Sequence, residues 1–253
     1  PNTTLSITVE GLSLLGPNTQ TAGDSAARVP EAVFNYNDLR ASAANITIDG
    51  LSFVAPSPTV RSVFLPPAND FDGLTVINNT FTGGLSAVFI ERGQSHNIAN
   101  NLISDLDTGN TAIVFDDFGV DIGNSSVTNN VIRRVRNGIS FTQQNMTISN
   151  NDIREFSGSA INPRGGEHVI SDNVIVGGDT PDPGIGSILG ITLVPNPSLE
   201  VTGNVLSGND ISNTDIAILV LDGTQPDASG VPNIATNNLL GGNVVGLQND
   251  DPD

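Results

Sequence analysis

The 253-residue chain is acidic, with 27 Asp and Glu residues against nine Arg and no Lys, and its formal net charge is −18. A surface this negative repels phosphate backbones, which argues against a nucleic-acid partner, and it attracts cations such as Ca²⁺. The chain has no Cys and two His, which excludes disulfides, thiol catalysis and Cys-based zinc sites. No run approaches the roughly 20 apolar residues that span a bilayer.

The first 44 residues predict irregular coils that carry an insertion. Val9 to Leu14 reads as a strand, a Gly-Leu corner and a second strand, and a polar insertion rich in Thr, Ala and Asp runs from Gly16 to Arg28. An apolar strand resumes between Glu31 and Tyr36.

A short pattern recurs along the chain, in which two apolar positions flank a pair of small polar residues that usually ends in Asn. Two early copies, Val9–Leu14 and Ile48–Phe53, carry Gly-Leu at the corner instead. The other copies are Val76–Phe81, Ile98–Ile103, Val127–Ile132, Ile148–Ile153, Ile170–Ile175, Val201–Leu206 and Ala235–Leu240. Nine copies at a fixed pattern indicate a repeat architecture.

The spacing of the copies selects the kind of repeat. The shortest spacings are 21 and 22 residues, and we interpret longer ones as loops inserted at the corners. A second apolar strand follows most copies, at Ala87–Ile90, Ala112–Phe115, Gly138–Phe141, Ile188–Leu193 and Ile216–Leu221. A succession of strand, corner and strand at this period predicts an all-β fold, a right-handed parallel β-helix (a solenoid) of about nine to ten coils. The period is too short for a propeller or for a horseshoe that contains helices.

The Asn residues at the corners have a physical reason. Asn tolerates the left-handed backbone conformation of a sharp corner, and stacked coils place equivalent side chains about 4.8 Å apart. Amides at that distance can bond to one another as a ladder inside the solenoid. The predicted ladder contains Asn79, Asn101, Asn130, Asn151, Asn173 and Asn204.

The repeat resembles the parallel β-helix repeat family of the pectate-lyase-like superfamily, over about residues 45–245. We expect one domain over 1–253, with irregular coils at 1–44, regular coils at 45–245 and a frayed tail at 246–253. The resemblance implies a site on a groove along one sheet, but the family's catalytic signatures are largely missing. Asp116-Asp117 precedes Asn213-Thr214-Asp215, which is the wrong order for polygalacturonase-like hydrolases, and the two later motifs of those enzymes have no match.

Strand alternation brings a set of polar side chains to one outer face. If Ile90, Phe115 and Phe141 point inward, the next residue of each strand points outward. The outward column then contains Glu91, Asp116, Thr142 and Arg164. Adjacent carboxylates raise one another's pKa and make an acid/base pair feasible, or they hold Ca²⁺, which takes several oxygen ligands.

The candidate site residues follow from this column. The catalytic candidates are Glu91, Asp116, Asp117 and Arg164, the substrate-binding candidates are Arg92, Thr142 and Asn162, and the metal candidates are Asp116, Asp117 and Asp121. The simpler alternative is that these are solvated charges on an acidic surface. His96 and His168 both directly precede an inner strand, which favours corner residues over catalysts.

Two functions remain open. We favour a non-catalytic extracellular or cell-surface β-solenoid, with structural, adhesive or assembly function, whose partners are other copies or neighbouring domains of a larger surface assembly. The absent signatures and the apparent lack of end caps support this interpretation. The alternative is a lyase or glycoside hydrolase that acts on an extracellular polysaccharide with an acidic groove, with Ca²⁺ as a candidate cofactor.

Overall fold

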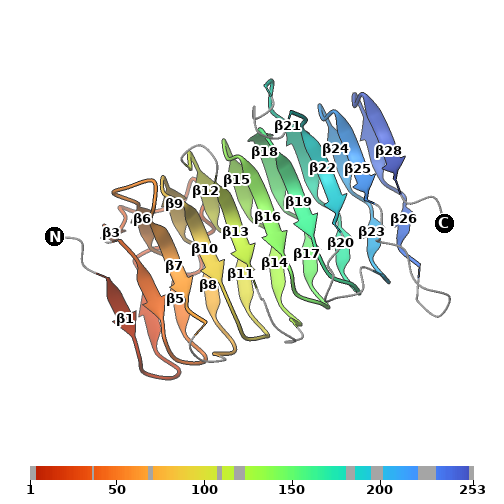
Figure 1. Cartoon of the computed structure of the whole chain (residues 1–253). Helices are drawn as coiled ribbons and strands as arrows, with labels where there is room; N and C mark the ends of the chain where they lie inside the picture. Colours follow the sequence, from red (N-terminus) through yellow and green to blue (C-terminus); the bar gives the residue numbers. More distant parts are fainter. Residues whose placement is uncertain are drawn as a thin grey trace.

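The computed structural model describes residues 4–35, 37–67, 71–106, 110–116, 123–180, 186–194, 202–221 and 232–250. Within these ranges the chain forms 28 strands and no helix, and the strands lie in three parallel sheets. Figure 1 shows the coils stacked along one axis, with β1 at one end and β26 and β28 at the other. The expected parallel β-helix of nine to ten coils is confirmed.

Each coil contributes one strand to each sheet. Sheet A contains β1 (Leu5–Ile7), β4 (Leu39–Ala41), β7 (Arg61–Leu65), β10 (Ser86–Ile90), β13 (Thr111–Phe115), β16 (Asn137–Phe141), β19 (Ser159–Pro163), β22 (Leu189–Leu193), β25 (Ile216–Val220) and β28 (Val245–Asn249). Sheet B contains β2 (Ser13–Leu15), β5 (Thr47–Asp49), β8 (Thr75–Ile77), β11 (Asn97–Ala99), β14 (Ser126–Thr128), β17 (Thr147–Ser149), β20 (Val169–Ser171), β23 (Val205–Ser207) and β26 (Ile234–Thr236). Sheet C contains β3 (Val33–Phe34), β6 (Ser52–Val54), β9 (Thr80–Thr82), β12 (Leu102–Ser104), β15 (Val131–Arg133), β18 (Asp152–Phe156), β21 (Val174–Gly177), β24 (Asp210–Ser212) and β27 (Leu239–Gly241).

The core is a set of columns of identical or similar side chains. In sheet A, Val88 pairs in register with Val63 on one side and Ile113 on the other, and all three are fully buried. In sheet C, the rings of Phe53 and Phe81 stack with centroids 4.8 Å apart. Full burial of such a side chain contributes roughly 1.5–3 kcal/mol, so a core of aliphatic residues with few aromatics is sufficient for this fold.

The corner between sheets B and C uses two residues with separate roles. The first takes the left-handed conformation, with φ of 57° at Asn78 and 56° at Asn100. The second turns its side chain into the solenoid, where Asn79 and Asn101 are buried. The sequence analysis assigned both properties to a single Asn column, and the structure divides them between the two members of each pair.

The inward amides form a continuous ladder. Each Asn donates from Nδ2 to Oδ1 of the Asn in the next coil at 2.8–3.2 Å, through Asn79, Asn101, Asn130, Asn151, Asn173, Asn209 and Asn238. Each Oδ1 in this series also accepts the backbone N–H of the preceding rung, as Asn130 Oδ1 does from Asn101 at 3.0 Å. Because a backbone N–H can only donate, this contact fixes the orientation of the amides.

One predicted member of the ladder is wrong. Asn209 takes the rung after Asn173, whereas Asn204 lies one corner earlier, where its Oδ1 accepts the N–H of His168 at 3.1 Å. Leu206 pairs with Ile170, so the repeat copy in this coil begins at Leu206 rather than Val201. The error arises because Thr-Gly-Asn and Ser-Gly-Asn both occur here, five residues apart, and both precede apolar residues.

The insertion after β2 crosses the corners of neighbouring coils as a strap, residues 16–32. The backbone N–H of Asn18 donates to Gly50 O at 3.3 Å and that of Gly23 to Asn100 O at 2.7 Å, while Arg28 Nη1 donates to Asn78 O at 2.7 Å. The first corner residues under the strap, Gly50 and Asn78, are buried. The equivalent residue of a later coil, Asn129, is exposed. The strap therefore ties three successive coils together along one edge.

Candidate functional site: the outer face of sheet A

The predicted polar column lies on the outer face of sheet A, where the strands end. Asp116 N donates to Ile90 O at 2.8 Å, Thr142 N to Phe115 O at 2.9 Å, and Arg164 N to Phe141 O at 2.8 Å. These bonds place Glu91, Asp116, Thr142 and Arg164 on consecutive strands. The structure thus brings the four side chains together as expected, while their chemical roles remain predictions.

The environment of the two carboxylates perturbs their ionisation. Burial raises the pKa of Asp116. The nearby guanidinium groups of Arg164 and Arg61 lower this pKa, but their effect is smaller than that of burial. Burial also raises the pKa of Glu91; Arg61 lowers it and the neighbouring Asp116 raises it further. A raised pKa in adjacent carboxyl groups is compatible with acid/base chemistry, and structural ion pairs produce the same shifts.

The sequence analysis missed an aromatic and cationic cluster beside this column. The guanidinium of Arg61 lies 3.9 Å from the ring centroid of Phe89 and 4.9 Å from that of Phe64, and one of its nitrogens lies 3.8 Å from Glu91 Oε1. The guanidinium of Arg40 also lies over the Phe64 ring, 5.6 Å from its centroid. Both rings are about nine-tenths buried, so they do not offer the open platform on which a sugar ring stacks.

A sequence signal for this cluster exists. Phe115 and Phe141 are the last residues of their strands and point inward, whereas Phe64 and Phe89 are next to last. Strict alternation places the latter two outside. The sequence analysis listed Phe89 within the apolar strand Ala87–Ile90 and did not assign it to the outer face.

The predicted metal site is described only in part. Asp117 and Asp121 lie outside the described residues. Within the described part of the chain, no three His, Cys, Asp or Glu side chains come together in a way that could hold a metal ion. Ca²⁺ binding at Asp116 therefore remains a prediction.

The two substrate-binding candidates beside the column differ in exposure. Asn162 lies on the same face, and its Oδ1 is buried without a hydrogen-bond partner among the described residues. Arg92 is exposed and follows Glu91 directly. Neither contact pattern identifies a ligand.

The two histidines are corner residues, as their sequence positions suggested. His96 Nδ1 accepts the backbone N–H of Leu74 at 3.1 Å, and His168 Nδ1 accepts that of Met146 at 3.2 Å. Burial lowers the pKa of His96 to about 4 and that of His168 to about 3. Both rings are therefore neutral at pH 7 and serve as hydrogen-bond acceptors for the preceding coil.

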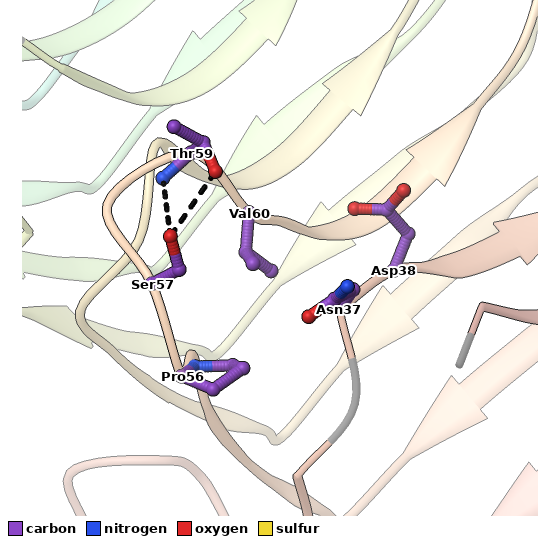
Figure 2. A pocket seen from close by; sticks show the side chains of 6 residues that line it. All are labelled: Asn37, Asp38, Pro56, Ser57, Thr59 and Val60. Atoms are coloured by element: carbon purple, nitrogen blue, oxygen red, sulfur yellow. Dashed lines mark hydrogen bonds between the residues drawn. The ribbon is translucent and has the colours of Figure 1, made fainter. Parts of the chain in front are cut away.

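Two shallow concavities lie away from the carboxylate column. One, of about 260 Å³, is lined by Asn37, Asp38, Pro56, Ser57, Thr59 and Val60. Figure 2 shows Asp38 and Asn37 on one side of it and the hydrogen-bonded Ser57 and Thr59 on the other. The second, of about 350 Å³, is lined by residues 155–157 and 177–180. Neither includes Glu91 or Asp116.

Comparison with known proteins agrees with this architecture. A family model described as the right-handed β-helix region matches residues 68–249, more than two thirds of the chain. The chain belongs to the right-handed β-helix family. No curated protein and no solved structure matches it.

Membership of the β-helix family establishes the handedness of the solenoid and leaves the activity open, because one fold carries many functions. The described residues contain no helix of the length and apolarity that a membrane-spanning helix needs.

Proposed function

We propose that this β-helix protein is a non-catalytic structural element that assembles through the ends of its solenoid. The observation that carries the proposal is the exposure of interior side chains at both ends. Within a solenoid each coil buries its neighbour, so an end without a cap leaves apolar surface and unpaired strand edges in water. A partner that covers these ends removes both costs.

At the N-terminal end the interior column of sheet A stops at an exposed residue. Leu5 pairs in register with Leu39, and its exposed fraction is 44%, whereas Leu39 is fully buried. The interior residues of the first strands of sheets B and C, Leu14 and Phe34, are partly buried. The outward-facing Leu15 and Val33 beside them are each 59% exposed. Among the described residues, no strand pairs with the free edges of β1, β2 and β3.

The C-terminal end repeats this arrangement. Leu247 continues the interior column of Ile218, yet it is 57% exposed while Ile218 is 2% exposed. In the same coil Leu240 continues the interior column of Ile211 and is partly buried. The outward-facing Leu239 is 64% exposed, and Val244 is 80% exposed. Apolar residues at this exposure favour a docking surface over a solvated end.

Sedimentation analysis tests the proposal. The chain is compared over a wide concentration range with an end-blocked variant that carries both Leu5→Lys and Leu247→Lys. We expect reversible association of the wild type and its loss in the variant, with unchanged far-UV circular dichroism. A wild-type protein that stays monomeric at all concentrations would overturn self-assembly as its function. We place the protein outside the cell or at the cell surface, which fractionation of cells that produce it checks.

A second candidate function, an enzyme acting on polysaccharide, is favoured by one observation. Glu91 and Asp116 lie on adjacent strands, and both have raised pKa values. If the face is catalytic, Asp116→Asn abolishes turnover of a uronate polymer while folding is unchanged. Equal and negligible turnover by the wild type and by Asp116→Asn across acidic and neutral polymers would exclude this candidate.

A further inference from the structure

The chain contains five copies of the sequence Asn-x-Ser/Thr, which accepts N-linked glycans in secreted proteins. They begin at Asn2, Asn45, Asn78, Asn124 and Asn145, of which Asn2 lies outside the described residues. A match this short arises easily in a chain rich in Asn. The positions of the other four copies in the solenoid distinguish usable acceptors from accidental matches.

Three of the four described copies lie on one edge of the solenoid, at the corner between sheets A and B. The hydroxyl residue of each copy, at Thr47, Ser126 or Thr147, is the first residue of a sheet B strand. The Asn of each copy lies two residues earlier and takes the left-handed conformation, with φ of 58°, 42° and 52° in chain order. Because Ser126 and Thr147 pair in register, the Asn residues of these two copies are stacked on adjacent coils.

The corners of sheet B do not by themselves generate the acceptor sequence. The register of sheet B gives the residues equivalent to these three Asn in other coils, and they have positive φ without being Asn: Gly11, Gly73, Ser95, Glu167 and Gly203. At the corner between sheets B and C, Asn129, Asn150 and Asn237 also have positive φ, but Val, Asp and Leu stand two positions later. A corner Asn and a following hydroxyl residue are therefore separate choices of the sequence, and the edge between sheets A and B combines them three times.

The side chains of these three copies alternate so that the acceptor groups face solvent. The residue between the Asn and the hydroxyl residue is buried in every copy, at Ile46, Ser125 and Met146. In contrast, Asn45 and Asn124 are exposed, and Asn145 is half-buried. A transferase can therefore reach the amide nitrogens of Asn45 and Asn124 in the folded chain.

The fourth copy shows the opposite arrangement. Asn78 is 5% exposed, and its Nδ2 donates to Asp49 Oδ1 at 2.8 Å. Its carbonyl oxygen accepts a hydrogen bond from Arg28 of the strap. A sugar on Nδ2 would break the bond to Asp49 inside a buried site, so a folded molecule cannot carry a glycan here. Asn78 is thus an internal control for the other copies.

We propose that Asn45 and Asn124 carry N-linked oligosaccharides, which places sugars along the edge between sheets A and B. The proposal rests on the location outside the cell that is part of the proposed function. Asn145 is a poorer acceptor, because it is half-buried and lies one coil, about 4.8 Å, from Asn124. Since a glycan is bulky, one at Asn124 obstructs access to its neighbour.

The modification is a glycosyl transfer from a lipid-linked oligosaccharide phosphate, with a transferase of the producing cell as catalyst. The Nδ2 atom of the Asn attacks the anomeric carbon of the first sugar, and a nitrogen–carbon bond forms there. The bond between that carbon and the phosphate oxygen breaks, and the lipid phosphate leaves with the electron pair. The amide nitrogen loses one proton, so the reaction needs no oxidant or reductant.

Peptide mapping of the protein purified from the cells that produce it tests the proposal. Because the chain has nine Arg and no Lys, trypsin places the four described copies in four separate peptides, 41–61, 62–92, 93–133 and 137–154. We expect mass spectrometry to find glycans on 41–61 and 93–133, lower occupancy on 137–154 and none on 62–92. Thr47→Ala should abolish the modification of 41–61, whereas Thr47→Ser should retain it, with unchanged far-UV circular dichroism in both variants.

Unmodified peptides 41–61 and 93–133 would overturn the proposal, and so would a glycan on 62–92 of the folded protein. A modification of 41–61 that survives Thr47→Ala would also contradict the assignment to Asn45. Fractionation of the same cells separates this failure from failure of the proposed function. An unmodified protein outside the cell would overturn glycosylation alone, whereas an unmodified protein inside the cell would overturn both glycosylation and the proposed location.

Discussion

Removing one rung of the amide ladder should destabilise the solenoid by an amount that depends on its position. Asn151 is 1% exposed, and its Oδ1 accepts two bonds from Asn130, from the backbone N–H and from Nδ2, both at 3.0 Å. Its Nδ2 donates to Val127 O and to Asn173 Oδ1, both at 2.9 Å. Asn151→Ala leaves two buried donors of Asn130 without this acceptor.

Asn130 Nδ2 keeps Ile98 O and Thr128 O as acceptors, so only the backbone N–H of Asn130 is left unsatisfied. A buried donor left unsatisfied costs about 1–3 kcal/mol, so Asn151→Ala should lower the free energy of unfolding by about that amount. The matched control is Asn238→Ala at the open end. Asn238 Oδ1 accepts the corresponding two bonds from Asn209, at 3.0 and 2.8 Å. Water reaches this position and can replace the lost amide, so the loss should stay at about 1 kcal/mol or less.

Urea unfolding followed by far-UV circular dichroism gives the two stabilities, and hydrogen exchange at the Asn130 amide reports the rung itself. We expect exchange at Asn130 to accelerate in Asn151→Ala and to stay slow in Asn238→Ala. If the two substitutions destabilise the protein equally, or if Asn151→Ala costs less than about 1 kcal/mol, the buried ladder is not an important source of stability and the reasoning fails.

Three further substitutions probe the strap, a corner histidine and the small residues of sheet A. Arg28→Ala removes the 2.7 Å hydrogen bond to Asn78 O, which comes from a side chain that is 9% exposed. We expect the free energy of unfolding to fall by about 2 kcal/mol and hydrogen exchange of backbone amides near Asn78 to become faster. Unchanged hydrogen exchange would refute the role of the strap. The pKa of His168 is lowered to about 3 by burial, so below pH 6.5 the unfolded chain binds a proton that the folded chain does not. Stability then falls by about 1.4 kcal/mol per pH unit from about pH 6.5 towards pH 3. His168→Asn, which copies Asn204 of the next coil, should flatten this dependence in urea midpoints measured at pH 7, 5 and 4; parallel profiles would contradict the assignment. At Gly190 an added Cβ would lie 2.2 Å from a backbone oxygen of the next coil, so Gly190→Val should prevent normal folding. A variant with the circular dichroism spectrum and the urea midpoint of the wild type would contradict this close packing.

Sequence patterns were sufficient for the fold and for the polar column because both depend on local rules. The Asn pair sets the register of each coil, and alternation from Ile90, Phe115 and Phe141 places Glu91, Asp116 and Thr142 on one face. These relations need only the period of the strand and the stacking of coils. The column was therefore predictable from the sequence.

The ladder failed at one coil for a physical reason. Corners in this solenoid recur every five residues along part of each coil, so Asn204 and Asn209 occupy successive corners. Both corners accept an inward Asn. Only the register of β23 with β20 distinguishes them, and the long insertion between these strands hides that register from the sequence.

The strap and the Arg61 cluster depend on contacts that no local pattern encodes. Arg28 reaches Asn78 across 50 positions, and a polar insertion has no periodicity that would indicate where it docks. Arg61 packs on Phe89 of the next coil, which requires knowledge of the register between coils. Such contacts become readable only when the coils are placed in space.

The ladder also gives the solenoid an electrical direction. Its amides all donate towards the C-terminal end, from Asn79 to Asn238, so their dipoles add over six intervals of about 4.8 Å and polarise one another. The strands supply little to oppose this sum, since sheet dipoles are small. The partial positive charge of this row therefore lies beside Asn238, at the C-terminal end of the described solenoid.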